Sequence, residues 1–89
     1  MTTMFVRHTV SDYKTWRRAY DDFAPVQKAK GVTAEAVYQA ADNPNDITVT
    51  HEFASLEAAQ AFAKSAELKG AMQNAGVAGP PTIWFTNKA

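Results

Sequence analysis

The sequence predicts an α+β fold in which two helices cover one face of a four-stranded antiparallel sheet. Three observations lead to this prediction. Apolar and polar residues alternate in several segments, as they do along strands with one buried face. Apolar residues recur at helical spacing in two other segments. These segments follow one another as strand, helix, strand, strand, helix, strand, which is the βαββαβ order of the ferredoxin-like fold.

The first strand and the first helix are predicted within residues 3–31. The segment 3–10 alternates as a strand, and Ser11 is the expected helix N-cap, with Asp12 in the first turn. Pro25 should kink this helix or restart it as a first-turn residue, and Gly31 should cap its end. One side of the helix carries an aromatic stripe, formed by Tyr13, Trp16, Tyr20 and Phe23.

A hairpin is predicted next, with strands at 32–41 and 47–53. The residues between them, 42–46, contain one proline and four Asx residues, which favour a turn. In this topology the first and third strands are the central neighbours of the sheet, and we expect them to run parallel. We also expect Arg7 and Glu52 to share the face opposite the helices, where they could form an ion pair.

The second helix and the last strand complete the fold. Ser55 should cap a helix that begins near Leu56 and ends at Gly76, with a break or weak point at Gly70. Residues 77–81 are expected to form a stiff loop, and residues 82–86 the last strand.

The last strand is apolar on both faces, because Ile83 and Phe85 point one way and Trp84 the other. Such a strand should be covered on both faces. The two helices cover only one face of the sheet. A second copy of the chain is the simplest cover for the other face, so we expect a homodimer formed through the sheet.

Length, charge and composition narrow the function classes. A chain of 89 residues is expected to form one domain, residues 1–89. It has no cysteine, which excludes disulfides and thiolate chemistry. Nine basic residues balance nine acidic ones, with no basic run, so neither nucleic acid nor a membrane is an expected partner. No apolar run approaches the roughly 20 residues of a membrane span. Charged residues come too early for a signal peptide, and we expect a cytoplasmic protein.

The chain's two histidines, His8 and His51, are the candidate catalytic residues. Both fall on the apolar phase of their strands, so both side chains should point into a core or a pocket. Burial disfavours the charged imidazole, which makes a neutral base near pH 7 plausible. The alternative is two core histidines that bond each other, a tyrosine or water. No metal is predicted, because Glu52 faces away from His51 and no spacing requires Asp12 or Asp22 as a further ligand.

A ligand pocket is predicted beside the aromatic stripe. Small residues on the second helix leave volume that larger core residues would fill, although the same pattern fits close helix-to-sheet packing. The stripe itself could equally be the helix's core face. The expected ligand is a small, flat organic molecule. The candidate ligand-binding residues are Tyr13, Trp16, Tyr20, Phe62 and Met72.

The chain resembles the small antibiotic-biosynthesis-monooxygenase-like proteins of the dimeric α/β-barrel superfamily over nearly its whole length. The resemblance rests on the element order and on five stretches. These are residues 6–10 running into 12–17, then 42–46, 51–53, 68–77 and 79–81. It implies homodimers that pair sheet to sheet, with a ligand cavity between each subunit's sheet and its helices. Relatives include cofactor-independent oxygenases acting on aromatic polyketide-like substrates, haem-degrading enzymes, isomerases and members with no known activity.

From the resemblance and the candidate histidines together, we expect a cofactor-independent monooxygenase-like or an isomerase- or cyclase-like enzyme acting on a small aromatic or polyketide-like molecule. In that role His8 would be the base, and His51 would position it or bind the oxyanion. The chain departs from the family's oxygenases, which commonly place an asparagine on the first strand and a tryptophan on a later helix. Here the first strand carries His8 and the first helix carries Trp16. The alternative function is a non-catalytic small-molecule binder or a structural dimer module.

Overall fold

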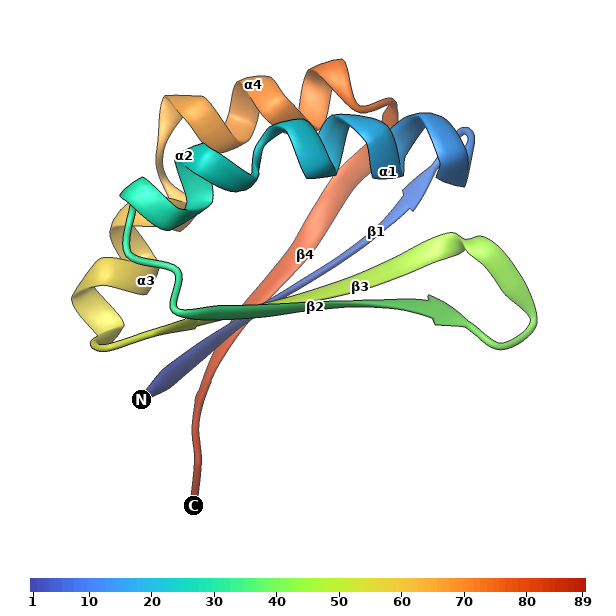
Figure 1. The fold of residues 1–89 in the computed structure, drawn as a ribbon. Helices are drawn as coiled ribbons and strands as arrows, with labels where there is room; N and C mark the ends of the chain where they lie inside the picture. Colours follow the sequence, from blue (N-terminus) through green and yellow to red (C-terminus); the bar gives the residue numbers. More distant parts are fainter.

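The computed structural model describes residues 1–89 and has a four-stranded antiparallel sheet with all its helices on one face (Figure 1). This confirms the predicted ferredoxin-like α+β fold. In Figure 1 the helices lie above the sheet, and the opposite face is uncovered. The elements in chain order are β1 (Thr2–Val10), α1 (Tyr13–Asp22), α2 (Ala24–Ala29), β2 (Ala34–Ala40), β3 (Asn43–Phe53), α3 (Leu56–Ala63), α4 (Ala66–Asn74) and β4 (Val77–Asn87).

Each of the two predicted helices is divided into two. Pro25 lies in the first turn of α2, as predicted, and separates it from α1. The second break lies at residues 64–65 and not at Gly70, which is inside α4. The break falls there because Ser65 is the N-cap of α4. Its hydroxyl accepts a hydrogen bond from the backbone N–H of Leu68 and so starts a separate helix. Asp12, and not Ser11, is the N-cap of α1, because its carboxylate accepts from the Thr15 N–H.

The sheet order is β2-β3-β1-β4, and every neighbouring pair is antiparallel. The prediction that β1 and β3 run parallel is therefore wrong. The helical crossover makes β2 parallel to β1, and the hairpin then reverses the chain, so β3 must oppose β1. The predicted pair of Arg7 with Glu52 fails for the same reason. In the antiparallel register Glu52 lies opposite Thr3, and Arg7 instead pairs with Asp46, with Nη2 and Oδ2 2.7 Å apart.

Two strands begin earlier than predicted. β3 starts at Asn43, directly after a tight turn, so residues 43–46 of the predicted turn belong to the strand. Their pairing with β2 includes a register shift between Gln39 and Ala40. β4 includes residues 77–81, which were expected to form a loop. Prolines are tolerated there because β4 is an edge strand and needs few of its N–H groups for pairing. Gly79, at a φ of 85°, coincides with a register shift against β1.

The core between helices and sheet consists of two apolar clusters. The alternation of β1 and β3 directs every second side chain toward the helices, and these side chains are the buried ones. One cluster contains Met4, Val6, Phe53, Ala59, Phe62 and Leu68. The other contains Val10, Trp16, Ile47, Val49 and Ala75. No helix of the fold combines the length and apolar character that crossing a membrane requires.

Candidate functional site

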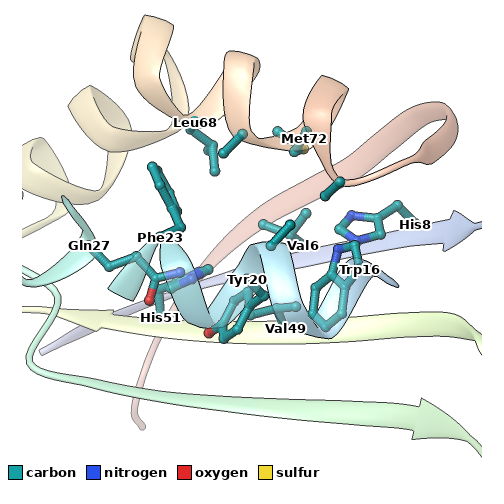
Figure 2. Close-up of a pocket in the computed structure, with 13 residues that line it drawn as sticks. Val6, His8, Trp16, Tyr20, Phe23, Gln27, Val49, His51, Leu68 and Met72 are labelled. Carbon is teal, nitrogen blue, oxygen red and sulfur yellow. The ribbon is translucent and has the colours of Figure 1, made fainter. Parts of the chain in front are cut away.

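A cavity lies where the two core clusters meet, between the central strands and the helices α1, α2 and α4 (Figure 2). The empty space is about 420 Å³ when the opening to solvent is included. The part of it in which the centre of a water molecule can lie without touching the walls is only about 40 Å³. This leaves room for about three waters. The walls are mainly apolar, and are formed by Val6, His8, Trp16, Ala19, Tyr20, Phe23, Gln27, Val49, His51, Leu68, Ala71, Met72 and Ala75.

His8 and His51 both line this cavity, as Figure 2 shows. Their side chains are only 7% and 3% exposed. His8 lies opposite Ile47, four residues along β3 from His51, so the two backbone positions are about 13 Å apart along the sheet. The two imidazoles therefore do not bond each other. No protein atom forms a hydrogen bond with any of their four ring nitrogens.

Aromatic side chains of α1 fill the space between the two histidines. The Trp16 ring meets His8 edge-on, with centroids 5.7 Å apart, and stacks on Tyr20 at 4.9 Å. The Tyr20 ring in turn lies 6.3 Å from that of His51. The i,i+4 spacing of Trp16 and Tyr20 places both rings on the cavity side of the helix. The cavity thus has an imidazole at each end and a flat aromatic wall between them.

The Tyr20 hydroxyl is already engaged at the rim of the cavity. It donates a hydrogen bond to Oε2 of Glu35 on β2. Burial, together with this carboxylate, raises the pKa of Tyr20 above its ordinary value, so the phenol stays protonated at neutral pH. The contact fixes the aromatic wall to the edge of the sheet. The free polar groups inside the cavity are therefore mainly the imidazoles.

Burial lowers the pKa of both histidines. The pKa of His51 falls to about 4, although the nearby charge of Glu35 opposes the shift. Burial also lowers the pKa of His8, and the charge of Asp46 opposes it. Both rings are therefore neutral at pH 7, and each offers one acceptor nitrogen and one N–H. His8 is the less buried of the two, so we expect it to be the stronger base.

The structure places five of the seven candidate residues around this cavity: His8, His51, Trp16, Tyr20 and Met72. Tyr13 does not line it, because its ring stacks on Trp16 at 6.0 Å nearer the start of α1. Phe62 does not line it either. Its ring is 1% exposed and packs on Phe53 and His51 in the core beneath.

Gln27 is the polar cavity residue that the sequence analysis missed. It is 3% exposed, and its side chain lies beside the Tyr20 hydroxyl. A signal for it was present, because Gln27 follows Phe23 by four residues and so continues the aromatic stripe. The predicted stripe ends at Phe23, and Pro25, where a kink or restart of the helix was expected, lies between Phe23 and Gln27.

A comparison with models of protein families gives one match. A family model described as antibiotic biosynthesis monooxygenase matches residues 6–74. A comparison with proteins of curated function gives no match.

Several solved structures share the fold. A proposed antibiotic biosynthesis monooxygenase from Bordetella bronchiseptica is 15% identical, with a TM-score of 0.85 over 99% of this chain and 96% of that one. SnoaB from Streptomyces nogalater, a cofactor-independent oxygenase, is 11% identical, with a TM-score of 0.81 over 99% of this chain and 92% of its own. At these identities the likeness concerns the fold alone.

Proposed function

Because the chain belongs to the antibiotic biosynthesis monooxygenase family, we propose that it is a cofactor-independent monooxygenase-like or cyclase-like enzyme. Its substrate would be a small, flat, aromatic or polyketide-like molecule bound in the cavity between the two histidines. One observation carries the proposal. The two buried imidazoles line an apolar cavity, and none of their four ring nitrogens has a hydrogen-bond partner in the protein. Each such group costs about 1–3 kcal/mol when it is left unsatisfied, and a ligand that bonds to them recovers this cost.

The two neutral imidazoles divide the chemistry between them. The free nitrogen of His8 accepts the proton of an acidic phenol or enol, which leaves an electron-rich carbon in the substrate. That carbon reacts with molecular oxygen, so that one oxygen atom enters the product and the other leaves as water. The substrate itself supplies the electrons. The low pKa of His51 keeps its N–H as a neutral donor toward an oxygen that gains negative charge.

Oxygen uptake by hydroxynaphthalenes tests this division of roles. With 1-naphthol and no added cofactor, we expect protein-dependent uptake in an oxygen electrode. Loss of a positioned base typically costs about 10²–10⁴-fold in rate. His8→Leu should therefore abolish the uptake while 1-naphthol still binds, as measured by calorimetry. His51→Leu should reduce uptake less, because it removes a donor and leaves the base.

Other outcomes would point to the alternative functions. Binding of 1-naphthol without oxygen uptake in the wild-type protein would indicate a non-catalytic binder. Unchanged uptake in His8→Leu would remove His8 from the mechanism. If His8→Leu unfolds at lower urea concentration and neither protein binds 1-naphthol, the histidines serve the core.

We also propose that a second copy of the chain covers the uncovered face of the sheet. Three aromatic side chains lie on that face, Phe5 and Trp84 side by side and Tyr38 on the strand at the opposite edge of the sheet. Phe5 stacks on Trp84 with ring centroids 5.2 Å apart and an interplanar angle of 7°. Trp84 and Tyr38 are 39% and 58% exposed. Exposed aromatic residues of this kind are typical of the centres of protein interfaces.

Replacement of Trp84 tests the dimer. Trp84→Asp should weaken dimerisation by about 30-fold or more, as loss of a central aromatic residue does. Leu56→Asp is the matched control, because Leu56 is 38% exposed but lies on α3. Sedimentation equilibrium measures both. A wild-type protein that sediments as a monomer, or a Trp84→Asp protein that dimerises as well as the control, would contradict this interface.

A further inference from the structure

A second hollow lies next to the histidine cavity, between α4 and the first half of β4. About 200 Å³ of it is wide enough for the centre of a water molecule, five times the corresponding space in the cavity. We call this hollow the α4–β4 groove. It is lined by Lys69, Met72, Gln73, Val77, Gly79 and Pro81.

Met72 is the one residue that lines both the cavity and the groove. Its neighbours at 68, 71 and 75 face the cavity, whereas residues 69 and 73 face the groove. Figure 2 shows Met72 on the underside of α4 at the edge of the cavity. A methionine side chain is unbranched and adopts several shapes at low cost. We therefore expect rotation of this one side chain to join the two spaces.

The two spaces differ in chemistry. The cavity is mainly apolar, and its polar groups are the two imidazoles, the Gln27 amide and the Tyr20 hydroxyl, while the groove carries the charged residue Lys69 and the amide of Gln73. Lys69 is exposed and takes part in none of the ion pairs of the fold, which involve Arg7, Arg17 and Lys30. No acidic residue lines the groove. Lys69 is thus a cation available to a ligand.

We propose that the α4–β4 groove is the outer part of the binding site and holds a carboxylate of the ligand against Lys69, while the ligand's aromatic ring passes Met72 into the histidine cavity. This inference rests on the proposed function, because it assigns a further chemical group to the ligand of the same cavity. The position of the groove supports it. A substituent on a ring held in the cavity would extend past Met72 into this neighbouring space, where Lys69 lies.

A pair of matched ligands tests the assignment. 2-Naphthol and 6-hydroxy-2-naphthoate share the same ring and hydroxyl, and only the second carries a carboxylate. We expect the wild-type protein to bind the naphthoate about two- to fivefold more tightly, which is the usual range for an exposed ion pair. Lys69→Met should lose this preference and keep its affinity for 2-naphthol. Lys64→Met is the control, because Lys64 is an exposed lysine at the end of α3, outside the groove.

Calorimetry measures the affinities, and amide NMR shifts locate the ligands. The naphthoate should shift the Gly79 amide in the groove, and 2-naphthol should not. Equal affinities of the wild-type protein for the two ligands, or a preference that survives in Lys69→Met, would overturn the groove and leave the proposed function intact. If neither ligand binds, the proposed function and this inference fall together.

Discussion

Acidification from pH 7 to pH 4 is expected to lower the free energy of unfolding by about 3 kcal/mol through His51 alone. In the unfolded chain the pKa of this imidazole is about 6.5, and burial lowers it to about 4 in the folded protein. Above pH 6.5 the ring is neutral in both states, and the shift has no effect. Between pH 6.5 and 4 the unfolded chain binds a proton that the folded protein does not, so stability falls. Burial of His8 acts in the same direction.

The carboxylates respond in a lower pH range, which separates their effect from that of the histidines. Asp12 and Asp46 have their pKa values lowered by hydrogen bonds to Thr15 and Arg7, and Glu67 has its pKa lowered by Lys30. The stability that they contribute is complete above their ordinary values, near 4, and is lost only below them. A decrease that begins near pH 6.5 therefore reports on the imidazoles.

Urea unfolding at fixed protein concentration, at pH 7, 6, 5 and 4.5, measures this decrease. His51→Leu should show a much flatter profile. It should also be the more stable protein at pH 5, because it no longer buries a polar ring without partners. An unfolding free energy of the wild-type protein that does not change between pH 7 and 4.5 would show that the folded protein accommodates a charged His51, which would remove the basis for a neutral donor there.

Much of the fold could be predicted from local patterns. The alternation of residues 3–10 and 47–53 determines which side chains face the helices, so the burial of both histidines follows from the sequence. The relative direction of β1 and β3 does not appear in any local pattern, because it depends on the whole chain path of crossover and hairpin. That one error also produced the wrong partner for Arg7. Proline content suggested a loop at 77–81, but the edge position of β4, which permits those residues to form a strand, is a property of the assembled sheet.

Part of the candidate site could be predicted from the sequence. Which apolar residues line the cavity and which pack in the core beside it could not. Trp16 and Tyr20 lie on the cavity side of α1, as their spacing indicates. Phe62 and Met72 both lie on the apolar side of the second helical segment, and the sequence pattern gives no way to distinguish them. The break at Ser65 separates their helices, so that one ring packs into the core and the other side chain faces the cavity. Only the packed structure makes this distinction.

Truncation of Phe62 is expected to cost about 3–5 kcal/mol of unfolding free energy, as loss of a fully buried phenylalanine does. Its ring contacts those of Phe53, His51 and Phe23, with centroids 5.5, 5.4 and 6.2 Å away. Met72→Ala should cost much less, because the Met72 side chain is only partly buried and already borders open space. Urea unfolding of both variants at pH 7 measures the difference.

For ligand binding we expect the reverse order: a change at Met72 should have the larger effect and a change at Phe62 the smaller one. Met72→Ala changes the wall between the cavity and the groove, so it should alter the affinity for 6-hydroxy-2-naphthoate. Since Phe62→Ala can leave too little stability for a folded chain of this size, Phe62→Leu is the variant for binding, and it should retain wild-type affinity. A loss of stability in Met72→Ala equal to that in Phe62→Ala would place Met72 in the core. The groove and the cavity would then be separate spaces, because a packed core residue does not move aside for a ligand.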